Sequence, residues 1–218
     1  MNLEVGLGAP SRAPLQGRSR ASFERMIDAA VKLLVERGND DFTLADVGKV
    51  GKVSIGSIYC RFDSKDDLIR AAQVRALTEV DSDQAAGLSK ASKEAGSLDE
   101  LVSLLIDNLA DTLHKHAPVL RPFMLRATSD PVVAGVGKKS YADTEEQFRD
   151  ALLLRRDEIR HPDPERAIHS IFRISYAAIA RYLGFGAATT AAWEGDWEVL
   201  KQDVAAMSAS FLLHPPRG

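Results

Sequence analysis

The chain has 218 residues, 45% of them hydrophobic, and a formal net charge of -3 at pH 7. This length can bury a substantial core in one large or two modest domains. The single cysteine excludes an internal disulfide, and no Cys or His spacing suits zinc. Because the N-terminus lacks a basic and apolar signal and no apolar run reaches membrane-spanning length, we expect a cytoplasmic protein.

The N-terminal part is slightly basic, since residues 1–75 hold 12 Lys and Arg against 10 Asp and Glu. Residues 1–18 are rich in Gly and Pro without periodicity, which predicts a disordered tail. Its basic end suits either an arm in the minor groove of DNA or an unstructured terminus. Apolar residues then recur at helical spacing from Phe23 to Leu34, which predicts an amphipathic helix ending at Gly38.

Two short helices joined by a tight turn follow this first helix. Thr43 and Asp46 form a capping box that starts a helix over about 44–50. After a three-residue turn, Ser54 is an N-cap for a second helix carrying residues 55–62. This arrangement describes a helix-turn-helix, whose second helix can lie in the DNA major groove.

Periodicity separates an inner from an outer face in these helices. The inner residues are Leu44, Val47, Val50, Val53, Ile58 and Phe62. The outer residues are Ile55, Ser57, Tyr59, Cys60 and Arg61. An outward Ile, Tyr and Arg on one short helix suits a DNA-contacting surface, and an ordinary solvated face remains the alternative.

The spacing of this region resembles the tetracycline-repressor (TetR-type) family of regulators, in the pattern G-x-x-x-x-T-x-x-x-[IV]-x-x-x-x-x-V-S-x-G-x-x-Y-x-x-F-x-S-K-x-x-L. The residues that match in register are Gly38, Thr43, Val47, Val53, Ser54, Gly56, Tyr59, Phe62, Ser64, Lys65 and Leu68. The likeness extends back through Arg20, Ile27, Ala29 and Ala30, so that it covers about the first seventy-five residues. Beyond them the resemblance is one of architecture.

The resemblance implies roles for individual residues. The outward residues of the second motif helix would reach bases, Tyr59 and Lys65 would hold phosphates, and Thr43 would cap a helix whose N-terminal amides point at phosphate. The expected DNA-binding residues are Thr43, Ser54, Ile55, Gly56, Ser57, Tyr59, Arg61 and Lys65.

Three residues depart from the family pattern. Gly48 and Gly51 stand where small helix formers are usual, and each costs roughly 0.5 to 1 kcal/mol relative to alanine inside a helix. Lys52 stands where the turn usually has glycine, and positive φ there costs a lysine roughly 1 to 2 kcal/mol. We therefore expect a weak first motif helix, with Gly51 rather than Lys52 in the left-handed conformation.

The rest of the chain is predicted to be helical, because capping residues and apolar stripes follow one another without a hairpin signal. Helices are expected over residues 65–88, 98–117, 119–128, 138–155, 164–183 and 197–213. Pro118 is taken to stop the second of these helices, and Asp130 with Pro131 to close the third. The fold is therefore all-α, with about nine helices. The predicted organisation is a disordered tail at 1–18, a helix-turn-helix DNA-binding domain at 19–68 and a helical effector-binding and dimerisation domain at 69–218.

The last two long helices have broad apolar stripes. Two copies could pair as a four-helix bundle in a homodimer, and the alternative is that these faces are the core of a monomer. A two-fold protein with two motifs matches a palindromic operator. The resemblance implies the same dimer.

Aromatic residues of the second domain are candidates to line an effector cavity, although each is equally suited to the core. The ligand-binding candidates are Phe123, Tyr141, Phe148, Phe172 and Tyr176, with Met124 beside them. Arg173 and Arg181 either meet an anionic effector or face solvent. The resemblance implies an effector pocket here without marking its residues.

Signals of catalysis are poor, since neither a nucleophile elbow, a phosphate-binding loop nor a dinucleotide fingerprint is present. His114 and His116 point in different directions on one helix, so a shared metal is not expected. We expect no catalytic residue, no metal and no cofactor. The sequence predicts a transcriptional regulator, expected to be a repressor that binds operator DNA as a dimer and is released by a small molecule. Two alternatives are a helical small-molecule-binding protein or enzyme with a degenerate helix-turn-helix, and a ligand-independent architectural DNA binder.

Overall fold

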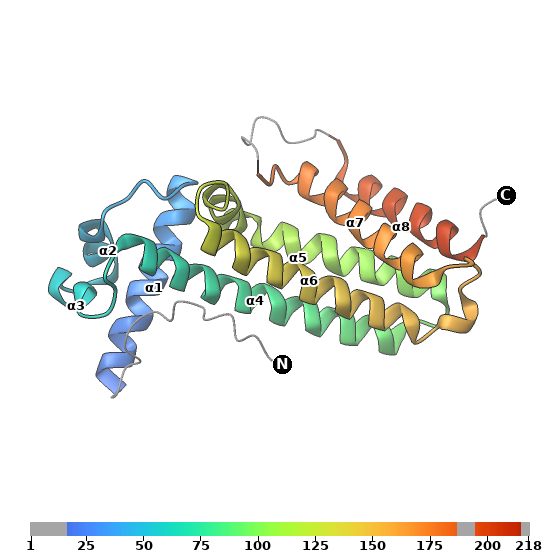
Figure 1. Ribbon diagram of the computed structural model, residues 1–218, viewed down its shortest axis with the longest axis horizontal. Coiled ribbons are helices and arrows are strands. Elements are labelled where there is room, and N and C mark those ends of the chain that lie inside the picture. The colour runs from blue at the N-terminus through green and yellow to red at the C-terminus, as the bar shows by residue number, and fades with distance from the viewer. Residues whose placement is uncertain (1–16, 187–194, 215–218) are drawn as a thin grey trace.

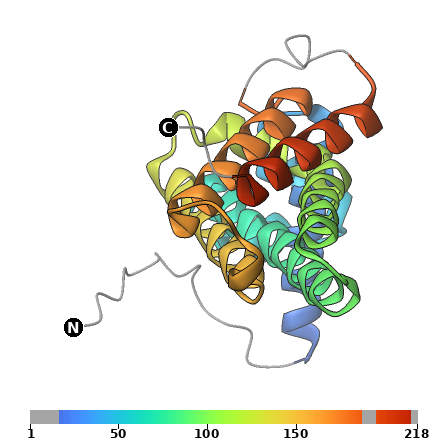
Figure 2. The same cartoon turned by 90° about the vertical axis from the view of Figure 1, so that its right-hand side faces the viewer.

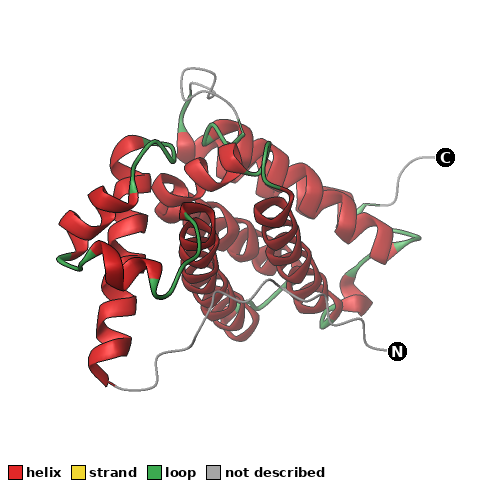
Figure 3. Cartoon of the chain, turned by 60° about the vertical axis from the view of Figure 1, so that its left-hand side comes forward, coloured by secondary structure: helices red, strands yellow, loops and turns green. Residues whose placement is uncertain are grey.

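The computed structural model describes residues 17–186 and 195–214, and within these residues the chain is all-α, as predicted (Figure 3). Eight α-helices and one short 3-10 helix follow one another, with no strand in the described part of the chain. They are α1 (Gly17–Arg37), α2 (Leu44–Gly51), α3 (Ile55–Tyr59), α4 (Lys65–Glu94), α5 (Leu98–Arg126), α6 (Pro131–Leu153), η1 (Arg156–Glu158), α7 (Pro164–Tyr182) and α8 (Trp197–Leu213).

The first three helices and the beginning of α4 form one end of the molecule, which we call the head (Figure 1). Its core consists of buried apolar side chains between Met26 and Ala76, and it includes a single residue from further along the chain, Phe123 of α5. The predicted amphipathic helix is confirmed as α1. It ends just before Gly38, which has a positive φ of 68°. The tail predicted for residues 1–18 lies almost wholly outside the described residues.

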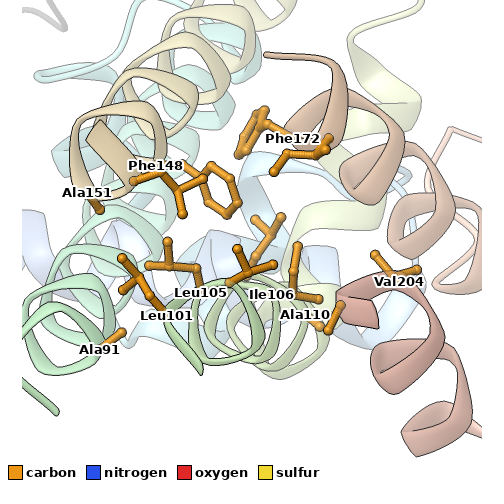
Figure 4. Close-up of a cluster of buried hydrophobic side chains, with 14 of the residues drawn as sticks. Ala91, Leu101, Leu105, Ile106, Ala110, Phe148, Ala151, Phe172 and Val204 are labelled. Carbon is orange, nitrogen blue, oxygen red and sulfur yellow. The ribbon is translucent and has the colours of Figure 1, made fainter. Parts of the chain in front are cut away.

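The remaining helices form a second part, which we call the body. There α7 and α8 lie side by side and cover α5 and α6 (Figure 2). Leu105 and Ile106 of α5 point toward Phe148 of α6 and Phe172 of α7 in the centre of this core (Figure 4). The long helix α4 contributes to both cores, since its buried apolar residues belong to the head up to Ala76 and to the body from Val80 onward. It thereby connects the two parts.

Helix α5 corrects one prediction. The helices expected over 98–117 and 119–128 are a single helix, and both Pro118 and Pro122 lie inside it. A proline removes one intrahelical hydrogen bond and crowds the carbonyl four residues earlier. The helix nevertheless continues because side chains on both sides of the prolines, such as Ala117 and Leu120, are buried in the core, and tertiary packing supplies most helical stability in proteins.

Helix α6 also begins earlier than predicted, at Pro131 rather than near residue 138. Asp130 does not close the preceding helix. Instead its Oδ1 accepts hydrogen bonds from the backbone N–H groups of Val132 and Val133, at 3.0 and 3.3 Å, as an N-cap does. Proline is favoured at the first helical position because its missing N–H would be unpaired there.

The other predicted helix starts are confirmed. The side chain of each N-cap residue accepts a hydrogen bond from the first turn of its helix. These residues are Thr43, Ser54, Ser64, Ser97, Asp163 and Asp196. Gly184 and Gly186, shortly after the end of α7, both have positive φ.

Candidate nucleic-acid interface and pocket

The turn between α2 and α3 differs from the prediction. Lys52, not Gly51, is left-handed, with φ 51° and ψ 47°, and Gly51 is the last residue of α2. The expectation that the turn is shifted by one residue is therefore wrong. Lys52 takes a conformation that disfavours every residue with a Cβ.

The reason lies in how closely other backbone segments approach the two glycines of α2. A Cβ added at Gly51 would lie 2.8 Å from the carbonyl oxygen of Arg25 in α1, and one at Gly48 would lie 2.9 Å from the carbonyl oxygen of Val53. Both positions therefore require glycine for packing. They bring α2 against α1 and hold the turn against α2.

Helix α3 presents its outer face at the end of the molecule farthest from α7 and α8 (Figure 1). Ile58 and Phe62 are fully buried, as predicted, while Ile55 and Tyr59 are 48% and 58% exposed. The helix is shorter than expected and ends at Tyr59, so that Arg61 lies beyond it in a turn. Two large apolar or aromatic side chains thus stand in solvent on a five-residue helix.

Ser54 and Ser57 are hydrogen-bonded to each other. Their hydroxyl oxygens lie 2.8 Å apart, and the backbone N–H of Ser57 donates to Ser54 Oγ, as a helix cap requires. Gly56 is exposed, with open space where a side chain would stand. The backbone of α3 can therefore approach another molecule closely at this residue.

The start of α2 is held by the predicted capping box. The backbone N–H of Thr43 donates to Asp46 at 2.9 Å, and the Thr43 hydroxyl makes a second bond to the same carboxylate. These bonds, with Arg37 at 3.3 Å, lower the pKa of Asp46 below its usual value. Thr43 itself is exposed beside α3.

The two cations expected at phosphates have partners inside the protein. Arg61 donates to the carbonyl and the hydroxyl of Ser19 and lies over the ring of Phe23. Lys65 donates to the carbonyl oxygen of Asp40 at 2.6 Å. Each cation has further N–H groups, so these contacts orient the side chains without using all their donors.

A group of charged side chains, which we call the charge cluster, joins the head to the body. At its centre Arg126, at the end of α5, contacts Asp40 before α2, Asp66 at the start of α4 and Asp130 before α6. Arg70 of α4 completes the cluster with an ion pair of 3.1 Å to Asp130. The cluster thereby ties α4, α5 and α6 together next to the helix-turn-helix.

A pocket of about 490 Å³ lies between α4, α5, α6 and α7. Its walls are mainly apolar and include three of the predicted ligand-binding residues, Phe123, Tyr141 and Tyr176, together with Met124. Phe148 and Phe172 do not line it. These two residues instead occupy the centre of the body core, at 2% and 0% exposure, so this pocket gives no support to their predicted role.

The basic side chains considered for an anionic effector also lie elsewhere. Arg173 is exposed and donates to Glu145 at 2.8 Å, and Arg181 is exposed near the end of α7. Sequence reasoning missed Gln73 of α4, which lines the pocket and is 3% exposed. A polar residue among the buried alanines of α4 was the available signal.

The histidines, the acidic side chains and the composition of the helices bear on other kinds of site. Within the described ranges, no group of three or more His, Cys, Asp or Glu side chains has metal-binding geometry. His116 lies 2.6 Å from Asp83, whereas the ring of His114 contacts Trp197, so the two histidines point apart as predicted. In the same part of the chain, no helix combines the length and the apolar character needed to cross a membrane.

Comparison with known proteins places the head in a family. Residues 26–72 match the model of the bacterial regulatory proteins of the tetR family. Over 54 residues the chain is 39% identical to YwcC of Bacillus subtilis, described as an uncharacterised HTH-type transcriptional regulator. That match covers 25% of this chain and only 24% of YwcC.

Solved structures match along nearly the whole chain. A protein of Mesorhizobium loti, described as a TetR-family transcriptional regulator, has a TM-score of 0.73 at 17% identity, over 90% of this chain and 98% of that one. A TetR transcription regulator of Haloarcula marismortui has a TM-score of 0.67 at 17% identity, over 89% of this chain and all of that one. At these identities the likeness shows the fold. The helix-turn-helix region thus resembles the tetR family, and the chain as a whole has the fold of solved structures described as TetR-family regulators.

Proposed function

We propose that the protein is a repressor that binds a palindromic operator as a dimer and leaves it when a small molecule enters the pocket. The observation that carries the proposal is the position of Phe123. This side chain lines the pocket and is at the same time buried in the core of the head, beneath the helix-turn-helix. A ligand that displaces Phe123 therefore acts on the core that supports α2 and α3.

The DNA-binding part of the proposal depends on α3. Its Ile55 and Tyr59 are exposed, and so is Thr43 at the start of α2. A helix of this kind, entering the major groove, contacts bases with its outer side chains while its neighbours hold phosphates. Lys65 and Arg61 are held at the border of this surface, where they can take the phosphate contacts.

The dimer is supported by apolar side chains that α7 and α8 leave in solvent. Ile174 is 66% exposed, Met207 62% and Val199 51%. Since α7 and α8 lie side by side on the outer face of the body, a second copy could cover both, forming a four-helix bundle (Figure 2). Such a dimer would present two heads to successive turns of the operator.

Release requires the ligand to favour a different head position, because only a difference in affinity between two states shifts their equilibrium. Two contacts connect the pocket to the head. One is Phe123, and the other is the charge cluster, whose Arg126 and Asp130 are close in sequence to the pocket residues Ala127, Thr128 and Val133. A shift of α6 would be passed to Asp40 and Asp66 in the head.

The proposal is tested with the full chain and a labelled duplex from the promoter region of its own gene. Fluorescence anisotropy across a salt series should show specific binding that weakens as salt rises, because phosphate contacts release counterions. Light scattering on the free protein should give the mass of a dimer, and Ile174→Glu with Met207→Glu should give a monomer. The matched control is Ala85→Glu with Ala86→Glu, at two exposed residues of α4 outside the proposed interface.

Absence of any complex at low salt would contradict the DNA-binding proposal. It would favour the alternative of a helical small-molecule-binding protein or enzyme whose helix-turn-helix no longer binds DNA.

A further inference from the structure

Several of the polar side chains that line the pocket have hydrogen-bond partners within the protein. Gln84 accepts from Asn108 at 2.8 Å, Ser140 donates to Asp81 at 2.7 Å, and Thr144 donates to a backbone carbonyl at 3.0 Å. The donor hydrogens of Ser140 and Thr144 are therefore already used. The choice of ligand depends more strongly on buried polar atoms that have no partner.

Gln73 provides one such atom. Its Nε2 donates to the carbonyl oxygen of Val133 at 2.9 Å, which fixes the orientation of the amide. Its Oε1 is buried and has no hydrogen-bond partner among the described residues. A buried acceptor without a donor is unfavourable, and an amide oxygen can accept but not donate. The structure therefore has an unused acceptor on a residue that lines an apolar pocket.

The pocket also lacks an internal charge. Lys138 is its one charged lining residue and is exposed. Burial raises the pKa of Tyr176 to about 12, and burial followed by Glu145 raises the pKa of Tyr141, so both phenols are uncharged at neutral pH. A carboxylate deep inside this pocket would lose its hydration, which is costly, and the one lining cation, Lys138, is exposed to solvent.

We infer that the pocket binds an uncharged, mainly apolar molecule whose one hydrogen-bond donor, a hydroxyl or an N–H group, bonds to Gln73 Oε1. The inference rests on the proposed effector pocket and adds the chemical class of its ligand. The donor occupies the pocket where α4 meets the start of α6, and the apolar part extends along α6 toward Tyr141, which lies one helical turn beyond Gly137.

This placement also specifies how the ligand is sensed. Gln73 lies one turn after Arg70 on α4, and their partners Val133 and Asp130 are spaced equally on α6. These two contacts, one helical turn apart, therefore join α4 to the start of the parallel helix α6. A ligand donor that bonds to Gln73 Oε1 contacts the same side-chain amide that donates to Val133. Ligand binding therefore affects the contact between α4 and α6.

The test uses matched probes and direct calorimetric titration of the full chain without DNA. The linear set is 1-decanol, decyl methyl ether and decanoate, and the aromatic pair is 4-phenylphenol and 4-methoxybiphenyl. In at least one set the hydroxyl compound should bind about tenfold more tightly than its ether, equivalent to about 1.4 kcal/mol. Decanoate should bind more weakly than 1-decanol.

Two variants assign this preference to one atom. Gln73→Met removes the acceptor and keeps the side-chain length, so the alcohol and its ether should bind equally well. Thr144→Val removes a pocket hydroxyl that is already bonded, and should keep the tenfold preference. The wild-type ratios decide the question even if Gln73→Met fails to fold.

The inference is overturned if the ethers bind as tightly as the alcohols, if decanoate binds best, or if no probe binds. Operator binding is measured separately by anisotropy. A protein that binds DNA but prefers decanoate would contradict the ligand class alone, whereas one that prefers the alcohols without binding DNA would contradict only the regulator.

Discussion

The carbonyl oxygen of Arg25 lies so close to Gly51 that a Cβ at this glycine would stand only 2.8 Å from it. The same hypothetical Cβ would lie 3.3 Å from the side chain of Ala29. From the sequence alone, Gly51 was expected to destabilise a short helix. In the structure, it is the residue that allows α2 to rest on α1 and so positions the helix-turn-helix.

Replacement of this glycine tests the close approach. Gly51→Ala should destabilise the protein by about 1 to 3 kcal/mol, because overpacking against backbone outweighs the gain in helix propensity. Urea denaturation followed by circular dichroism measures the change. Gly56→Ala is the control, since a Cβ there meets nothing within 4 Å and should leave stability unchanged or slightly raised. Equal effects of the two substitutions would show that packing at Gly51 is unimportant.

Lys52 tests the strain in the turn. Since it is the only described non-glycine residue with positive φ, Lys52→Gly should raise the free energy of unfolding by about 1 kcal/mol. The same denaturation experiment measures this gain, and Lys49→Gly, in the helical part of α2, should instead lower stability by a similar amount. A loss of stability in Lys52→Gly would contradict the strain at this residue.

The charge cluster predicts a large effect at Arg126. Arg126→Met leaves carboxylates of Asp40, Asp66 and Asp130 without their shared partner and should destabilise the protein by about 2 to 3 kcal/mol. Lys139→Met breaks an exposed pair with Asp143 and should change stability by less than about 1 kcal/mol. Thermal unfolding compares the two variants. A small loss for Arg126→Met would remove the cluster as a link between head and body.

Asp130 predicts a dependence of stability on pH. Burial opposes its ionisation, but the N–H groups of Val133 and Val132 and then Arg70 outweigh burial and hold its pKa below the usual 3.8. A lowered folded-state pKa adds stability that is complete above 3.8 and is lost as pH falls through the folded value. Asp130→Asn should therefore lose less stability than the wild type between pH 4 and pH 2, as measured by urea denaturation at each pH. Parallel curves for the two proteins would contradict this assignment.

The outer face of α3 predicts two kinds of DNA-binding defect. Tyr59→Ala and Lys65→Ala should weaken binding to all sequences similarly, since phosphate contacts carry no base information. Substitutions of Ile55 or Ser57 should instead change which operator variants are preferred. Anisotropy with a panel of single-base variants separates the two outcomes. Wild-type preference in the Ile55 and Ser57 variants would mean that another surface contacts the bases.

The sequence by itself determined most of the helices and most of their starts, because capping and periodicity act within a few residues. Thr43 with Asp46, Ser64 with Asp67 and Asp163 with Pro164 mark helix starts without reference to the rest of the chain. The spacing of the motif likewise identified the helix-turn-helix and its buried and exposed faces.

Only the tertiary structure decided what depends on residues far apart in the chain. It showed that α5 continues through Pro118, with the buried residues Ala117 before it and Leu120 after it. It also showed that Gly51 approaches Arg25 closely and that Lys52 has the left-handed conformation in the turn. It also distinguished two candidate ligand-binding residues, since Phe123 lines the pocket and Phe172 is buried in the core. An aromatic residue at helical spacing is equally suited to a core and to a cavity, and the difference arises only from which helix packs opposite it.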